Sequence, residues 1–234
     1  MRYFVGLFIS ILISSAWPIA TQQLDVAQAS IPGPADIRIN HDVLVEDQRL
    51  GFIFLGVLHG TGLHGGFVER TGCSGVLPKG RLQINQGATV RQAMDALVAA
   101  NPGYQWELKD DVVNLMPRGG APLLDTRIAK FQMDATGLAV GAVLQDLLRL
   151  PEVREREAAL GLKGGIHAGP GGGGGGIEIH PVPRKPVPVH VNLQNLSLQE
   201  AFNKVVGISP DGGWIYRETD CNGAKTYIVE MASD

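Results

Sequence analysis

The residues best suited to chemistry lie in one glycine-rich stretch: His59, His64, Glu69 and Cys73. Imidazole, carboxylate and thiol groups are zinc ligands and can also activate a nucleophile. These four residues therefore allow a metal-dependent or Cys/His hydrolase built on the loop from His59 to Cys73. The alternative is a helix end followed by a turn, because histidines five positions apart do not share a helix face.

Other candidates for cofactor or metal binding are weaker. His167, His180 and His190 are spread along a Gly/Pro-rich segment, which does not preorganise ligands, so we expect at most adventitious metal binding there. The six glycines Gly171–Gly176 are not followed by the Gly-Lys-Ser/Thr sequence of a phosphate-binding loop. We expect no cofactor, and only His59 and His64 stay as weak metal candidates.

Composition excludes one class of partner. The 234 residues hold 20 Lys and Arg against 23 Asp and Glu, which gives a net charge of −3, and 44% of the side chains are hydrophobic. No run of basic residues provides the electrostatic footprint that nucleic acid or an anionic membrane needs. We therefore expect an ordinary globular chain that binds neither by charge.

The N-terminus is typical of an export signal. Arg2 precedes an apolar run over Tyr3–Trp17, and Ala27-Gln28-Ala29 is a small-x-small exit, which predicts a signal peptide over residues 1–29. About fifteen apolar residues are short for a membrane span, which needs about twenty. The prediction is an exported protein, periplasmic or secreted, with no integral membrane segment after cleavage. The alternative is an uncleaved N-terminal anchor.

The two cysteines lie in the exported part of the chain. An oxidising compartment favours pairing of Cys73 with Cys221, the one connectivity available. The alternative is two independent thiols, one of them buried as a small hydrophobic side chain.

An internal repeat is the most specific signal. Thr89–Val98 aligns without a gap on Ser197–Val206 at an offset of 108, and the same offset carries Trp106 onto Trp214. Thr89 and Ser197 each precede a Gln or Glu at the third position, the capping-box signature of a helix start. Apolar residues then follow helical spacing. The expected shared core consists of Val90, Ala93, Leu97 and Trp106 in the first copy, and of Leu198, Ala201, Val205 and Trp214 in the second.

The surroundings of the two helices repeat as well. Alternating segments before and after each helix predict strands at 81–85, 104–108 and 112–116, and at 187–193, 214–218 and 225–231. Upstream we expect a strand over 36–45, a helix over 47–59 and a strand over 66–70. In the second half we expect a strand over 127–134, a helical stripe from Val140 to Leu148 and a further helix opened by Pro151.

These elements predict two tandem α+β domains, each of β-α-β-β-α-β-β type with two helices packed on small sheets. The first covers 35–117, the second 123–232, and 118–122 is a short linker. We expect the Gly/Pro-rich segment 164–188 to be a disordered loop. Asp110-Asp111 is expected to form a tight turn, the loop at Cys221-Asn222-Gly223 a longer one, and Glu155 and Glu157 a solvated helix face.

This order of elements, with the segments Thr89-Val90-Arg91-Gln92-Ala93-Met94 and Ser197-Leu198-Gln199-Glu200-Ala201-Phe202, resembles the secretin and TonB short N-terminal domain. The chain departs from that family at Met94 and Phe202, where the family usually has Leu, and in the segment 164–188. The resemblance implies the fold, and a role as an adaptor for an outer-membrane machine.

Our leading prediction is therefore a non-enzymatic, exported interaction module of the cell envelope that binds another envelope protein. Two alternatives stay open. One is the hydrolase described above, which requires His59, His64, Glu69 and Cys73 to converge in one pocket. The other is a structural spacer that lacks a specific partner. The sequence does not indicate an oligomeric state.

Overall fold

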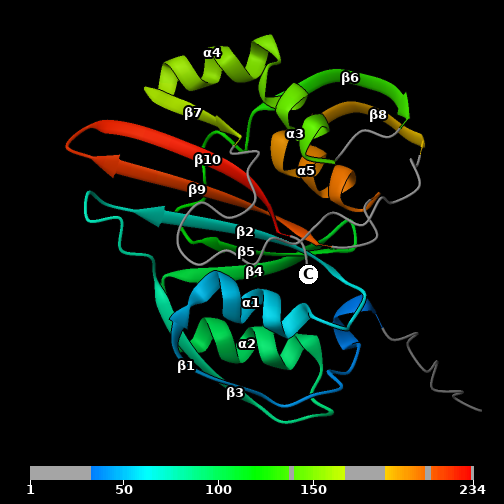
Figure 1. The fold of residues 1–234 in the computed structure, drawn as a ribbon, viewed down its shortest axis with the longest axis vertical. Coiled ribbons are helices and arrows are strands. Elements are labelled where there is room, and N and C mark those ends of the chain that lie inside the picture. The colour runs from blue at the N-terminus through cyan, green and yellow to red at the C-terminus, as the bar shows by residue number, and fades with distance from the viewer. Residues whose placement is uncertain (1–32, 137–139, 167–187, 209–211, 233–234) are drawn as a thin grey trace, which may run out of the picture. The chain divides into compact units, whose positions relative to one another are not determined.

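A computed structural model describes residues 33–136, 140–166, 188–208 and 212–232. It confirms an α+β fold (Figure 1). After a 3-10 turn at Pro34–Asp36, the first half contains β1 (Val43–Arg49), α1 (Leu50–Leu58), β2 (His64–Thr71), β3 (Lys79–Ile84), α2 (Val90–Ala100), β4 (Tyr104–Lys109) and β5 (Val112–Pro117). The second half contains β6 (Arg127–Thr136), α3 (Val140–Leu148), α4 (Pro151–Leu160), β7 (Leu162–Ile166), β8 (Pro188–Ser197), α5 (Leu198–Val206), β9 (Gly213–Cys221) and β10 (Ala224–Ala232).

The two halves have the same strand pairing. In the first, β1 pairs with β3, while β4, β5 and β2 form a separate row with β4 antiparallel and β2 parallel to β5. In the second, β6 pairs with β8, and β9, β10 and β7 form the matching row with the same directions. Each half therefore combines a two-stranded ribbon with three strands of a larger sheet.

One six-stranded sheet joins the halves, because β2 pairs in parallel with β9 to give the order β4-β5-β2-β9-β10-β7. The described residues make one compact unit. The segment 118–122 thus connects two lobes that share a sheet. The division into two domains stays a prediction, although each lobe has its own hydrophobic cluster.

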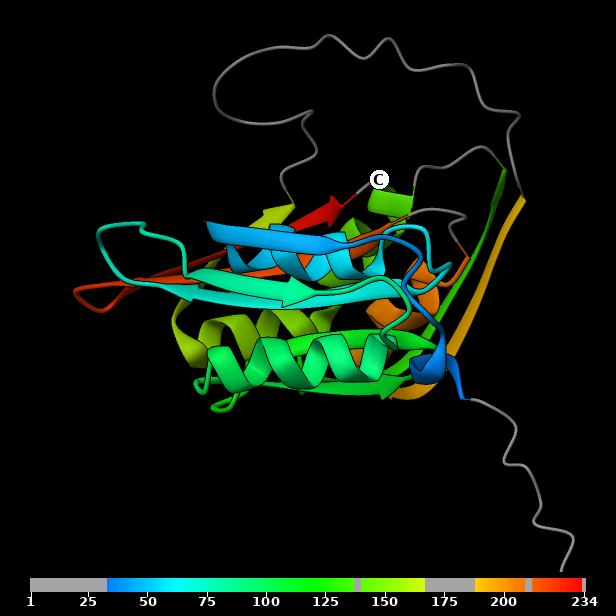
Figure 2. The same cartoon turned by 90° about the horizontal axis from the view of Figure 1, so that it is seen from below.

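The two clusters lie on opposite faces of the sheet. Figure 2 shows the same fold from below, with the paired strands β6 and β8 at one side. Phe67 of β2 packs with α1 and α2, whereas its neighbour Val68 packs with Trp214 and Tyr216 among the residues of the second lobe. Successive side chains of a strand point to opposite faces. The helices of the first lobe therefore cover one face and those of the second lobe the other.

The predicted caps of α2 and α5 are present. Thr89 Oγ1 accepts from the Gln92 amide at 3.1 Å and Ser197 Oγ from the Glu200 amide at 3.2 Å, and both N3 side chains bond back to the cap residue. Two otherwise unpaired amides are satisfied at each helix start. Of the expected shared core, all members are buried except Trp106, which is half-buried.

Several boundaries differ from the sequence predictions. The strand expected over 36–45 begins only at Val43 and continues to Arg49, so the helix expected over 47–59 begins at Leu50. The loop near Cys221 is not long: Asn222 and Gly223 form a two-residue turn with positive φ, as Asp110 and Asp111 do in the first lobe.

The segment 164–188 was predicted as a loop throughout, and this is wrong at both ends. The left-handed cap Gly161 ends α4, after which β7 runs to Ile166 on a parallel ladder with β10, and β8 starts at Pro188. Two glycines in β7 make the segment look like a loop in the sequence, and the strand forms because its backbone pairs with β10. The remainder, 167–187, with His167 and His180, lies outside the described residues.

Candidate functional site

The four residues of the hydrolase hypothesis do not form one site. His64 and Glu69 are five positions apart on β2, so their side chains point to opposite faces about 16 Å apart along the strand. Cys73 is bonded to Cys221 and is no free nucleophile. Within the residues that the structure describes, no three His, Cys, Asp or Glu side chains are grouped as metal ligands.

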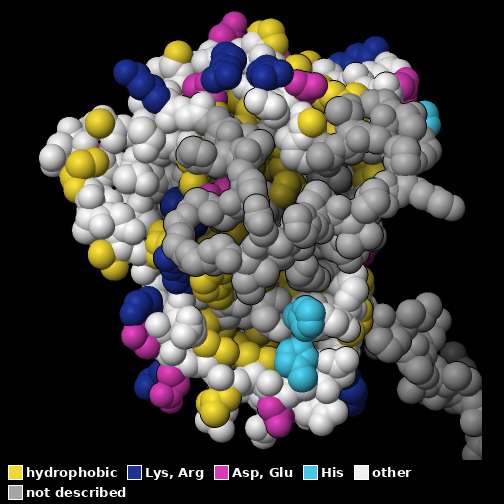
Figure 3. Space-filling model, in the orientation of Figure 1, with side chains coloured by type: hydrophobic (Ala, Val, Ile, Leu, Met, Phe, Trp, Pro, Cys, Tyr) yellow, Lys and Arg dark blue, Asp and Glu magenta, His cyan; other side chains and the backbone are white. Residues whose placement is uncertain are grey.

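The predicted histidines have separate surroundings. His59 lies next to His41, with ring centroids 6.3 Å apart, while His64 Nδ1 is 3.2 Å from the carbonyl oxygen of Gly212. On the face seen in Figure 3, histidine side chains lie together over the first lobe, next to hydrophobic side chains. His190 instead contacts Asp134 at 2.7 Å on the exposed ribbon of β6 and β8.

The junction of β2 and β9 brings together polar groups from the two lobes. The register pairs Glu69 with Arg217 and Thr71 with Thr219, and Cys73 and Cys221 follow two positions later. Arg217 Nε donates to Glu69 Oε2 at 2.6 Å, and the two threonine hydroxyls are 2.8 Å apart. The sequence predicted the disulfide, whose Cα atoms are 4.4 Å apart, but not the parallel ladder that leads to it.

Glu69 is buried, at 2% exposure, and carries a charge that Arg217 neutralises. Arg217 also lies 3.6 Å from Glu230 of β10, so one guanidinium serves two carboxylates. Burial, and secondarily the charge of Glu69, raises the pKa of Tyr104 to about 12. The cluster therefore links β2 of the first lobe to β9 and β10 of the second.

Behind the junction, on the opposite face, lies a second cluster of polar groups around two stacked tyrosines. The rings of Tyr216 and Tyr227 are 5.6 Å apart, and burial raises the pKa of Tyr216. Tyr227 donates to Glu157, which Arg154 also contacts at 2.7 Å. Glu157 is therefore buried, at 5% exposure, and the prediction that it lies on a solvated face is wrong. Sequence reasoning missed it because Arg154 and Glu157 resemble an ordinary surface ion pair.

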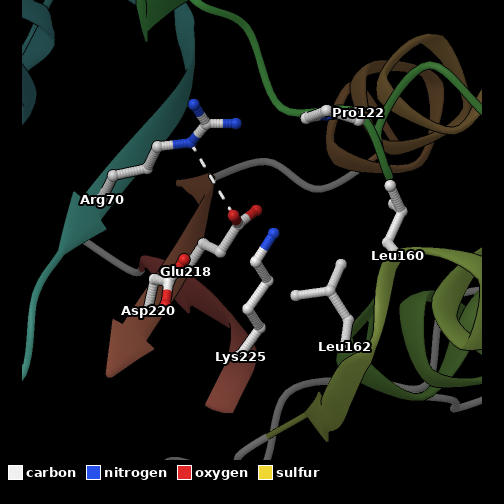
Figure 4. A pocket seen from close by; sticks show the side chains of 7 residues that line it. All are labelled: Arg70, Pro122, Leu160, Leu162, Glu218, Asp220 and Lys225. Carbon is white, nitrogen blue, oxygen red and sulfur yellow. Dashed lines mark ion pairs between the residues drawn. The ribbon is translucent and has the colours of Figure 1, made fainter. Parts of the chain in front are cut away.

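A cavity of about 240 Å³ opens beside this cluster, at the end of the sheet nearest the disulfide. Figure 4 shows Arg70, Glu218, Asp220 and Lys225 converging there over an apolar wall. Its lining residues are Arg70, Pro122, Leu160, Leu162, Glu218, Asp220 and Lys225. Arg70 Nε is 3.9 Å from Glu218, which also accepts from Tyr216 at 3.1 Å. Ligand pockets usually measure about 300–1,000 Å³, so this cavity is small for one.

The outer strand β4 presents a different kind of surface. The Trp106 ring is half-buried, the Arg91 guanidinium lies 5.9 Å from its centroid, and the indole Nε1 donates to Asp95 at 2.8 Å. Gln105 and Glu107 on the same strand are exposed. Trp106 of β4 and Arg91 of α2 are of the residue types that concentrate binding energy in protein interfaces. Trp106, expected in the shared core, does pack against the cluster of the first lobe, but it keeps part of its solvent contact.

Both ends of the six-stranded sheet are edges. Within the described part of the chain, β4 pairs only with β5, and β7 only with β10. An edge strand has unpaired backbone donors and acceptors, to which another strand can add. The two edges, with Trp106 on one of them, are the candidate functional site.

No helix among the described residues is long and apolar enough to cross a membrane. A scan against protein-family models finds no match, and neither does a search of curated proteins or of solved structures. The resemblance to the secretin and TonB short N-terminal domain therefore stays a prediction, supported by residues Thr89–Met94 and Ser197–Phe202.

Proposed function

We propose that this protein is an exported, non-enzymatic interaction module of the cell envelope, which binds a partner protein through an edge of its six-stranded sheet. The single observation that carries the proposal is the β4 edge. There, among the described residues, an extended backbone with one strand partner lies beside the half-buried Trp106 ring and the exposed Arg91 of α2. Addition of a strand supplies main-chain hydrogen bonds, and the aromatic side chain supplies specificity.

The disulfide supports export. Structural disulfides persist in oxidising compartments outside the cytoplasm, and Cys73–Cys221 joins the two lobes. Together with the predicted signal over residues 1–29, it favours the periplasm or the exterior as the place of action.

The test is a photo-crosslinking amino acid at Gln105, an exposed residue of β4 beside Trp106. The matched control places it at Gln86, which is exposed in the turn after β3. After irradiation of intact cells and purification under denaturing conditions, we expect one envelope protein attached through Gln105 and not through Gln86. Trp106→Ala should reduce that yield.

Equal labelling from both positions, or none from Gln105, would refute the β4 edge as a binding site. The structural-spacer alternative predicts no specific adduct from either position. The hydrolase alternative predicts hydrolytic activity that is lost in His64→Ala.

A further inference from the structure

The structure contains an example of how its own sheet edges accept a strand. The inner edge of the second lobe is β9, and the first lobe covers it with β2 over seven register pairs, from Gly65↔Gly213 to Thr71↔Thr219. At its start the ladder is close, since a Cβ added to Gly213 would clash with the carbonyl oxygen of Gly65.

Among the described residues, the two strands with an open edge, β4 and β7, are the counterparts of the two that meet in this junction. In the first lobe β4 begins the closing hairpin as β9 does in the second, and β2 is the parallel neighbour of β5 as β7 is of β10. The open β4 edge thus corresponds to the edge that accepts β2. The open β7 edge corresponds to the strand that is accepted.

Strand directions are compatible with the same contact between two molecules. If β5 points up, β4 points down, β2 and β9 point up, and β10 and β7 point down. Because β7 and β4 have the same sense in the sheet, a second copy displaced along the sheet, and turned about the axis of displacement to follow the sheet twist, would place its β4 parallel to β7 of the first. That is the geometry of β2 beside β9.

We propose that the chain associates head to tail with further copies of itself, β7 of one molecule pairing in parallel with β4 of the next. The proposal rests on the interaction function proposed above and names the partner as a second copy. A contact between two different surfaces is heterologous. Repeated displacement along the sheet, with rotation only about that same axis, does not form a closed ring. The product is an open row of molecules that share one sheet, with helices on alternating faces.

The side chains of the two edges fit this contact. Lys163 of β7 and Glu107 of β4 are exposed and of opposite charge. The half-buried Trp106 ring would lose its remaining solvent contact.

The test blocks one edge at a time. Gln105→Cys on β4 and Lys163→Cys on β7 are exposed positions that can each be coupled to polyethylene glycol maleimide, and Gln86→Cys coupled in the same way is the control. Molar mass is measured against concentration by sedimentation velocity, on full-length exported protein with the native disulfide retained. The unmodified chain and the Gln86 control are expected to grow in mass with concentration, beyond a dimer.

Each edge-blocked protein alone should stay monomeric, with an apparent dissociation constant at least tenfold higher. Mixed one to one, the two should form a dimer and nothing larger, because each still has the edge that the other lacks. Circular dichroism and thiol counting check that both are folded. A monomeric unmodified chain, or a dimer formed by either blocked protein alone, would overturn the proposal.

The outcome is separable from that of the proposed function. If Gln105 crosslinks a different envelope protein while the purified chain stays monomeric, the interaction module stands and self-association falls. If neither occurs, both proposals fail.

Discussion

The carboxylate of Glu69 accepts a 2.6 Å hydrogen bond from Arg217 Nε, and the two residues come from different lobes of the chain. Arg217 is partly exposed, with 23% of its side chain accessible, whereas only 2% of the Glu69 side chain is accessible. The pair therefore lies at the rim of the buried junction. Loss of Arg217 would leave a buried carboxylate without a partner, which costs more than loss of Glu69 beside the partly exposed guanidinium.

We expect Arg217→Met to lower the free energy of unfolding by about 3 kcal/mol, because it leaves a buried carboxylate without its cation. Glu69→Gln in the same background should recover most of that loss. Urea unfolding of the four proteins of this double-mutant cycle measures the coupling. Additive effects would show that the pair is not energetically coupled.

The disulfide should act through the unfolded chain. Cys73 and Cys221 are 148 positions apart, and closing so long a loop restricts the unfolded state by about 5 kcal/mol on the chain-entropy account. We expect the double substitution of both cysteines by Ser to lose up to this amount in urea unfolding. A reducing agent should lower the free energy of unfolding of the wild-type protein by the same amount. It should not change the stability of the double variant, which has no disulfide.

The sequence predicted what depends on neighbouring residues. The capping boxes at Thr89 and Ser197, the alternation of the strands and the tight turn at Asp110 each require only a few positions. It could not predict the ladder between β2 and β9, because backbone pairing between strands 148 positions apart has no side-chain signature. Glu69 was therefore assigned to a candidate catalytic loop instead of to this ladder. Trp106, expected in the shared core, packs against the cluster of the first lobe but is only half-buried.

The two tryptophans that align at the 108-residue offset, Trp106 and Trp214, should differ in how much their substitution lowers the free energy of unfolding. Each donates to the residue eleven positions earlier, Trp214 to Asn203 at 2.9 Å and Trp106 to Asp95 at 2.8 Å. Trp214 and Asn203 are both fully buried, while Asp95 is exposed.

Trp214→Phe should therefore cost about 3 kcal/mol, since it leaves a cavity and a buried amide oxygen without a donor. Trp106→Phe should cost about 1 kcal/mol or less, because water can solvate Asp95. Thermal unfolding of the two variants compares them, and equal losses would contradict the difference in burial.

Two glycines give opposite predictions for the same substitution. Gly56→Ala in α1 meets no atom within 4 Å, so it should stabilise the protein by about 0.5–1 kcal/mol through helix propensity. Gly213→Ala would force β9 away from Gly65 and should destabilise the junction. Chemical denaturation reports both, and a stable Gly213→Ala protein would show that the β2–β9 ladder can relax.

Glu200 makes stability depend on acid. Its carboxylate accepts from the Ser197 amide at 2.6 Å and lies 2.9 Å from Lys109 of the other lobe, and these contacts lower its pKa from 4.5 to about 2. Because the folded state favours the ionised carboxylate, Glu200 contributes fully to the free energy of unfolding above about pH 4.5. This contribution is lost as the pH falls toward 2. Glu200→Gln should therefore narrow the difference in stability between neutral and acid conditions, whereas Glu155→Gln on the exposed face of α4 should not. Urea midpoints measured from pH 7 down to pH 2 test this, and parallel pH profiles for the wild-type and Glu200→Gln proteins would exclude Glu200 as the source of acid sensitivity.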